Sequence, residues 1–265
     1  RPGLPPHIRQ ARLAPTSEPF LVKLFESDEG SGPGERSRNP VRPVGQYREL
    51  LSRVSTLPTA RRRTAERVML WPRAVVGARE HAVGVAYPPL GRPFLLTDGN
   101  AQTGDFLLAQ EPDFQGCEVP SARQRAELLL DVVVAHELLH TIGLAHGDTN
   151  WKNFVYGLES GRGRGRLIDI DSVTALDDPR PPLMHQPGWG DDPTMSPHTR
   201  DTLRVALLVA RLAAPEPDWD RWAPPELGAP WFTPWLRDLT RRTLDDPREG
   251  SVSEFTAALT EALRN

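Results

Sequence analysis

Two sets of residues between positions 136 and 171 have the types and spacing to carry out chemistry. The first set, His136, Glu137 and His140, fits the pattern H-E-x-x-H. Two histidines four residues apart lie on one face of a helix, where they can share a Zn²⁺ ion while the glutamate acts as general base. Gly143 and His146 extend the pattern to H-E-x-x-H-x-x-G-x-x-H. This set predicts zinc-dependent hydrolysis of a peptide bond.

The second set overlaps the first and predicts phosphoryl transfer. His146, Asp148 and Asn153 fit the pattern H-x-D-x-x-x-x-N, and Asp169 follows after a Gly- and Arg-rich segment, expected as a loop, and a short apolar run. Phosphoryl transfer needs an Asp that orients or takes the proton of the attacking hydroxyl, and an Asn and a second Asp that hold Mg²⁺ against the β- and γ-phosphates. We expect a loop to carry Asp148 and Asn153, and the turn after a short hairpin to carry Asp169.

The phosphoryl-transfer interpretation accounts for more of the sequence than the zinc interpretation. Members of the protein kinase superfamily commonly carry L-H-x-x-G-x-x-H-x-D, which this chain matches with Leu139, His140, Gly143, His146 and Asp148. That pattern explains half of the apparent zinc motif and leaves only His136 and Glu137 to coincidence. The zinc interpretation explains nothing after His146. We therefore predict a phosphotransferase and keep a zinc metalloprotease as an alternative.

The composition narrows the class of protein without identifying its function. A chain of 265 residues is long enough for one large domain or two small lobes. A net charge of −3 gives no electrostatic basis for binding nucleic acid or an anionic membrane. Cys117 is the single cysteine, which excludes an internal disulfide and favours a reducing, cytoplasmic location. No apolar run approaches the roughly 18 residues of a transmembrane helix, so we expect no membrane span.

The elements that must position these residues begin with a predicted β-hairpin over residues 7–26. Its second strand, Phe20–Phe25, carries Lys23 among apolar residues. One alternative is that Lys23 lies at the edge of a sheet, where lysine discourages aggregation. Gly3 is the only glycine before Lys23, so no G-x-G-x-x-G loop is evident ahead of the hairpin.

Helices and further strands are expected between this hairpin and position 90. Apolar periodicity and turn residues predict two helices, two short strands and a linking segment, at residues 44–57, 59–70, 74–77, 82–86 and 87–90. The first helix carries Glu49 and the second carries Glu66. Each glutamate could be an ordinary solvated helix residue.

A long helix is expected to lead into the loop that contains Asp148. Ser121 is a suitable N-cap for a helix that runs to about Thr141, and Gly143 is placed to end it. The later elements are expected to be an irregular acidic segment, an apolar helix and two closing helices, at residues 177–197, 203–213 and 236–263. Asp201 stands just before the apolar helix, where an acidic residue also favours the helix dipole.

This order of motifs and elements resembles the eukaryotic-like Ser/Thr protein kinases of bacteria. It is most similar to an atypical actinobacterial branch with HGD in the catalytic loop and DID in place of DFG. The resemblance covers about residues 7–264, and its specific part is Leu139–Asp171 together with the C-terminal helices. It implies an α+β, bilobal, protein-kinase-like fold, with a small β-rich N-lobe over residues 1–88 and a mainly helical C-lobe over residues 89–265.

The resemblance also implies roles for the residues of the catalytic loop and the DID segment. Asp148 would orient or deprotonate the acceptor hydroxyl, while Asn153 and Asp169 would bind Mg²⁺. Lys152 could contact the transferred phosphate, or could be an ordinary surface lysine. Asp171 replaces the glycine of DFG, and we expect it to be a turn residue rather than a further metal or capping group.

The remaining implied roles concern the nucleotide. Lys23 would contact the α- and β-phosphates of ATP and would pair with a helix glutamate, for which Glu49 is our candidate and Glu66 the alternative. Tyr87 would begin the hinge between the lobes, where backbone groups meet adenine. Asp201 would brace the backbone of the catalytic loop from the helix that follows it.

The resemblance therefore implies an ATP- and Mg²⁺-dependent Ser/Thr protein kinase that transfers the γ-phosphate to a protein hydroxyl. A pseudokinase or nucleotide-binding scaffold is an alternative, suggested by the missing Gly-rich loop and by Asp171. A small-molecule kinase is another, suggested by His146-Gly147-Asp148. The expected partner is a protein substrate or a small hydroxyl acceptor, and not a nucleic acid.

Overall fold

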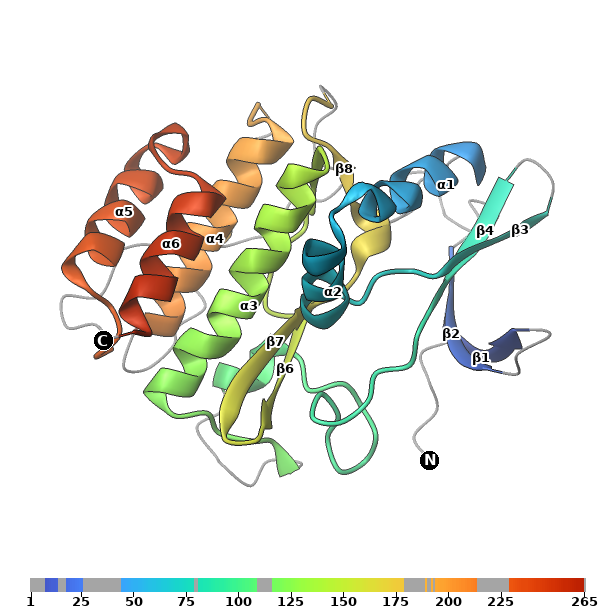
Figure 1. Cartoon of the computed structure of the whole chain (residues 1–265), viewed down its shortest axis with the longest axis horizontal. Helices are drawn as coiled ribbons and strands as arrows, with labels where there is room; N and C mark the ends of the chain where they lie inside the picture. Colours follow the sequence, from blue (N-terminus) through green and yellow to red (C-terminus); the bar gives the residue numbers. More distant parts are fainter. Residues whose placement is uncertain are drawn as a thin grey trace, which may run out of the picture.

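The protein has mixed α+β architecture, as the sequence predicts. The computed structural model describes residues 8–13, 18–25, 44–78, 81–108, 116–178, 189, 192, 194–213 and 229–264. A four-stranded sheet lies on one side of the molecule and helices α3 to α6 on the other, with α2 and the β6–β7 hairpin between them (Figure 1). Among the described residues, no helix has the length and apolar character needed to cross a membrane.

The four-stranded sheet places Lys23 in an interior strand. Its strands pair antiparallel in the order β1-β2-β4-β3, with bounds Ile8–Leu13, Glu18–Leu24, His81–Tyr87 and Ala74–Ala78. The predicted hairpin is confirmed as β1 and β2. Lys23 pairs with Ile8 on one side and with Val85 on the other. Lys23 therefore does not lie at a sheet edge, and protection of an edge does not explain it.

Helix α1 (Val44–Ser52) packs on this sheet, and α2 (Thr59–Val68) connects the sheet to the rest of the molecule through contacts with α3 and β7. A 3-10 turn, η1 (Arg53–Thr56), lies between the two helices. The Tyr47 ring of α1 stacks on Phe25 with a centroid distance of 5.0 Å. Beyond α2, the Leu70 amide donates a hydrogen bond of 2.8 Å to the Leu167 carbonyl, which joins this part of the chain to strand β7.

Helix α3 (Ala122–Thr141) forms the centre of the helical part. A capping box between Ser121 and Gln124 satisfies backbone donors at its N-terminus, and a broad set of its side chains is buried, as predicted. Gly143 follows the helix with a φ of 74°, a conformation that favours glycine. Helices α4 (Pro197–Ala213) and α6 (Val252–Ala262) pack on α3, and α5 (Pro234–Asp245) packs on α4 and α6.

Short strands and turns carry the residues between these helices. Two small antiparallel pairs are β5 (Leu144–Ala145) with β8 (Thr174–Ala175), and β6 (Phe154–Glu159) with β7 (Arg162–Leu167). The 3-10 turns are η2 (Gly104–Leu108), η4 (Ile170–Ser172) and η5 (Pro247–Glu249). The Gly- and Arg-rich segment, which the sequence suggests as a loop, is therefore strand β7.

The glycines of β7 allow it to lie directly on α3. A Cβ atom at Gly163 would overlap the backbone carbonyl oxygen of Gln124, and one at Gly165 would overlap that of Leu128. Two of the arginines that alternate with these glycines reach acidic side chains of α3 instead. Close packing, rather than flexibility, accounts for the glycines in this strand.

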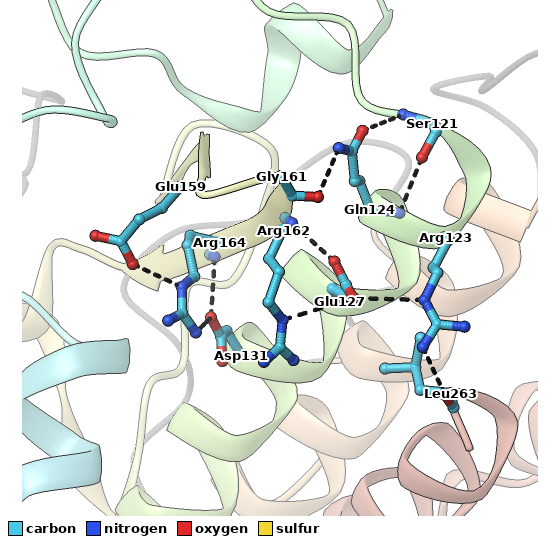
Figure 2. Close-up of polar contacts among 12 residues, drawn as sticks. Ser121, Arg123, Gln124, Glu127, Asp131, Glu159, Gly161, Arg162, Arg164 and Leu263 are labelled. Carbon is cyan, nitrogen blue, oxygen red and sulfur yellow. Dashed lines mark hydrogen bonds and ion pairs between the residues drawn. The ribbon is translucent and has the colours of Figure 1, made fainter.

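Two buried acids of α3 fix the backbone of β7, as Figure 2 shows. The Glu127 carboxylate accepts a hydrogen bond of 2.9 Å from the Gly163 amide and lies 3.7 Å from Arg162. Asp131 lies 3.8 Å from Arg164 and also pairs with Arg67 of α2. Because the chain leaves β7 toward Asp169, these contacts help to set the position of that residue.

Candidate active site

The structure brings together predicted site residues that lie far apart in the sequence. Lys23 in β2 forms an ion pair with Asp169, which lies just after β7, 146 residues along the chain. The two side chains are partly exposed, at 17% for Lys23 and 33% for Asp169. Asp169 has a φ of 64°, in the left-handed region that few non-glycine residues adopt. Such strain often accompanies a functional constraint.

Asp171 is a second partner of Lys23, which corrects its prediction as a plain turn residue. Its backbone does lie in the 3-10 turn η4, but its carboxylate is fully buried, with Oδ2 3.1 Å from Lys23 Nζ. Burial and the nearby Asp169 charge raise the pKa of Asp171, against the opposing effect of Lys23. Burial alone would lower the pKa of Lys23, but the charges of Asp169 and Asp171 outweigh it and raise that pKa.

Tyr87 contributes a side-chain hydroxyl to this cluster. It is the last residue of β4 and is buried, and its hydroxyl donates a hydrogen bond to Asp171. Burial, followed by the Asp171 charge, raises the pKa of the phenol, so Tyr87 remains a donor. The sequence predicts a backbone contribution from Tyr87 to a hinge, whereas the structure gives its side chain a specific contact.

The predicted pairing of Lys23 with a helix glutamate is not formed. Glu49 lies on the outer face of α1, with 67% of its side chain exposed, and pairs with Arg53 at 3.1 Å. Glu66 pairs with Arg73 at 3.3 Å and is also exposed. Helix α1 presents Tyr47 to the sheet instead, because Tyr47 fills the apolar space beside Phe25. Within the described part of the chain, Asp169 and Asp171 are the acidic partners of Lys23.

Asp148 and Asn153 lie side by side, as the motif predicts. The Asn153 amide nitrogen donates to the Asp148 carboxylate at 2.9 Å and to the Asp148 backbone carbonyl. Arg204, fully buried in α4, lies 3.4 Å from the Asp148 carboxylate and donates to the Thr149 carbonyl at 3.2 Å. The carboxylate of Asp148 remains partly exposed, at 21%.

Backbone contacts join this loop to the segment before Asp169. The Ile168 amide donates to the Asn153 carbonyl at 2.9 Å, and His146 Nε2 donates to the Ile168 carbonyl at 2.9 Å. Lys152, between Asp148 and Asn153 in the sequence, is exposed, and its backbone amide donates to Asn150. The loop that carries Asp148 and Asn153 is therefore hydrogen-bonded to Ile168, the residue before Asp169.

The Asp201 carboxylate contacts the backbone of the loop that contains Asp148, as predicted. It is fully buried and accepts hydrogen bonds from the backbone amides of His146 at 2.8 Å and Gly147 at 2.9 Å. His140 Nε2 lies 3.2 Å from the same carboxylate. Burial alone would raise the pKa of Asp201, but the His140 hydrogen bond and the nearby imidazoles outweigh it and lower that pKa.

The histidines of the apparent zinc motif are engaged in hydrogen bonds, which does not favour the zinc alternative. His136 donates from Nδ1 to the Val132 carbonyl at 2.9 Å, and its Nε2 meets the Thr149 hydroxyl at 2.6 Å. Burial lowers the pKa of His136 to about 4. His140 and His146 use Nε2 in the contacts given above. A search of the described residues finds no group of three or more His, Cys, Asp or Glu side chains that could hold a metal ion.

The remaining donor set fits Mg²⁺ bound together with phosphate. Mg²⁺ in phosphotransferases takes one or two protein oxygens and completes its octahedron with phosphate oxygens and water, so no cage of three acids is needed. The Asp169 carboxylate supplies one such oxygen. The Asn153 amide nitrogen is used by Asp148, which leaves the amide oxygen to face a cation. These two side chains could hold the ion, and Lys23 could meet phosphate oxygens.

Comparison of the sequence with models of known protein families and with curated proteins finds no match. The geometry given above is therefore the basis on which a function can be assigned.

Sequence reasoning missed the roles of Asp171, Arg204 and the Tyr87 hydroxyl. One feature of the sequence, the position of its lysines, does point to this region. Among 32 Lys and Arg residues in the sequence, Lys23 and Lys152 are the only lysines. Lysine offers a compact point charge where arginine offers a planar fork, so the two are not interchangeable at a specific site. In a chain that otherwise uses arginine throughout, both lysines lie beside the candidate catalytic residues.

Proposed function

We propose that this protein is an ATP- and Mg²⁺-dependent phosphotransferase, and specifically a Ser/Thr protein kinase that transfers the γ-phosphate to a protein hydroxyl. The observation that carries the proposal is the meeting of Lys23 and Asp169 beside the hydrogen-bonded pair of Asp148 and Asn153. A phosphate-binding cation, a metal-binding carboxylate, a metal-binding amide and a hydroxyl-orienting carboxylate are the side chains that phosphoryl transfer requires.

Each residue has a defined task in this proposal. Asn153 and Asp169 would hold Mg²⁺, which supplies charge neutralisation at the β- and γ-phosphates when bound. Lys23 would bind the α- and β-phosphates. Asp148, oriented by Asn153 and Arg204, would accept the hydrogen bond of the acceptor hydroxyl and align its oxygen with the γ-phosphorus. Catalysis would come from positioning and electrostatics rather than from a covalent intermediate.

Two clusters of buried side chains support a bilobal kinase-like arrangement, although the larger one also takes in residues of α2 from before position 88, such as Ala65 and Val68. One cluster of buried side chains, which includes Phe25, Tyr47 and Tyr87, lies between the sheet and α1. A separate and larger cluster surrounds α3 and contains Leu128 and Leu139. Lys23 would belong to the smaller lobe and Asp148 to the larger, so the site would lie where the two lobes meet.

A thermal-shift titration with ATP, with and without Mg²⁺, tests the proposal. We expect ATP to raise the melting temperature only when Mg²⁺ is present, because Asp169 and the triphosphate repel each other without the cation. No response at millimolar MgATP would contradict the proposal. Transfer of labelled γ-phosphate to proteins, compared with transfer to small hydroxyl compounds, then identifies the acceptor class. Binding without transfer to either class would favour a nucleotide-binding scaffold.

A further inference from the structure

Lys23 needs a partner that does not also serve the metal ion. Among the described residues its charge partners are Asp169 and Asp171, and Asp169 is the carboxylate assigned to Mg²⁺. We propose that Asp171, oriented by the Tyr87 hydroxyl, is the positioning residue that holds Lys23, in place of a helix glutamate. This inference rests on the proposed function for its consequence in nucleotide binding, but its structural part stands on the contacts alone.

Asp171 is built to hold a cation in a fixed position. Its side chain is completely buried, and its two oxygens lie 3.2 Å and 3.1 Å from Lys23 Nζ. Tyr87 donates its hydroxyl to Asp171 Oδ1, and the Asp171 backbone amide donates to the Tyr87 oxygen at 3.2 Å. A buried carboxylate with a cation and a hydroxyl donor has little freedom to turn toward another ligand.

Asp169 differs from Asp171 in exposure. One third of its side chain remains accessible, so it can reach a ligand that enters from solvent. Without a ligand, Asp169 and Lys23 neutralise each other. When Asp169 binds Mg²⁺, this ion pair must loosen, and Asp171 then keeps the ammonium of Lys23 in place for the phosphates. In the Asp169-Ile170-Asp171 segment, Asp169 thus serves to bind the metal ion and Asp171 serves to position Lys23.

The rival partner is Glu49, and the packing of α1 opposes it. Glu49 and Tyr47 are two residues apart and therefore point to different faces of the helix. A rotation that turned Glu49 toward Lys23 would remove Tyr47 from its stack on Phe25. It would also break the pair between Glu49 and Arg53.

The two lysines of the chain make a direct test possible. Protein labelled with ¹⁵N-lysine contains two side-chain ammonium groups, and only one that is held by buried acceptors exchanges slowly enough to give a sharp NMR signal. Lys23→Arg assigns that signal. We expect Asp169→Asn to retain it, because Asp171 still holds Lys23, and the double variant Asp169→Asn with Asp171→Asn to lose it. Loss of the signal in Asp169→Asn alone would overturn the inference. This test needs no nucleotide.

A second measurement links the pairing to nucleotide binding. Asp171→Asn and Tyr87→Phe should weaken MgATP binding by roughly tenfold or more, because a charge-assisted contact to the phosphate-binding lysine is lost. The matched control is Asp177→Asn, which removes an exposed carboxylate a few residues away and should leave affinity unchanged. Glu49→Gln tests the rival: an affinity loss there with none in Asp171→Asn would overturn the inference.

Failure of the inference and failure of the proposed function give different results. If the wild-type chain does not bind MgATP while the Lys23 signal behaves as expected, the assigned function is wrong and the pairing stands. If wild-type binding is normal but Asp169→Asn abolishes the signal, the function stands and the role of Asp171 is wrong.

Discussion

The guanidinium of Arg204 lies 3.4 Å from the carboxylate of Asp148, although Arg204 is completely buried in α4. Burying a cation costs free energy, because the charge loses its hydration. The position of this buried cation next to the candidate hydroxyl-orienting residue therefore suggests a specific role. Arg204 also donates to the Thr149 carbonyl, so it contacts both the side chain of Asp148 and the backbone of the next residue. We infer that Arg204 fixes the direction in which Asp148 points.

Replacing Arg204 should reduce turnover and stability together, with little effect on nucleotide affinity. Arg204→Gln keeps a long polar side chain but removes the charge and part of the hydrogen bonding. We expect a loss of about 2 kcal/mol in the free energy of unfolding, the scale of a hydrogen bond to a charged group. Chemical denaturation measures the change in stability, MgATP titration measures the nucleotide affinity, and a phosphoryl-transfer assay measures the turnover. Normal turnover in a destabilised variant would show that Arg204 serves the fold alone.

Asp148→Ala and Asp169→Ala should separate the chemical step from metal binding. Asp148 contacts Asn153 and Arg204 but is not assigned to the nucleotide, so its removal should abolish phosphoryl transfer while MgATP affinity stays nearly intact. Asp169→Ala should remove the Mg²⁺ dependence of ATP binding. Calorimetric titration of ATP, with and without Mg²⁺, distinguishes the two. Near-normal turnover in Asp148→Ala would refute the role given to this residue.

The sequence predicts the parts of this site that depend on short spacing, and misses those that depend on packing. The Asp148–Asn153 contact follows from a motif within one loop, whereas the brace from Asp201, which joins residues far apart in the sequence, is implied only by the family resemblance. The failure of Glu49 to pair with Lys23 could not be predicted, because the face that α1 turns to the sheet depends on how Tyr47 packs on Phe25. The burial of Asp171 depends on contacts with β2 and β4, far away in the sequence.

The same distinction explains the apparent zinc motif and the strand β7. Helical spacing places His136 and His140 near each other, but the partners available at each ring, the Thr149 hydroxyl and the Asp201 carboxylate, decide what the imidazoles bind. Alternating Gly and Arg residues resemble a loop by composition alone. Only the surface of α3 shows that Gly163 and Gly165 are required for contact.

Stability should fall in weakly acidic solution because His136 is buried in neutral form. Its pKa is lowered from the ordinary value of 6.5 to about 4, mainly through burial. Between pH 6.5 and pH 4, the unfolded chain therefore binds a proton at His136 that the folded chain does not bind. The stability that neutral His136 contributes is complete above pH 6.5 and is lost as the pH falls toward 4. One such group corresponds to about 3 kcal/mol at about 1.4 kcal/mol per pKa unit.

Equilibrium unfolding at a series of pH values checks this prediction. Compared with the wild type, His136→Gln should show a smaller loss of stability between pH 6.5 and pH 4, whatever its stability at neutral pH. Asp201, whose pKa is lowered, contributes to the pH dependence mainly below this interval. Parallel pH profiles for the two proteins would contradict the assignment of a neutral, buried His136.

Alanine at Gly163 should displace β7 and with it the candidate site. The added Cβ would overlap the Gln124 carbonyl oxygen in α3, and neither backbone can move without breaking contacts along the hairpin. We expect destabilisation of about 3 kcal/mol, at the upper end for overpacking, and weaker MgATP binding because Asp169 follows this strand. The matched control is Gly91→Ala, since a Cβ there meets no atom within 4 Å. Equal stability of both variants in chemical denaturation would mean that β7 can lift from α3 at little energetic cost, and that Asp169 is positioned by its own loop.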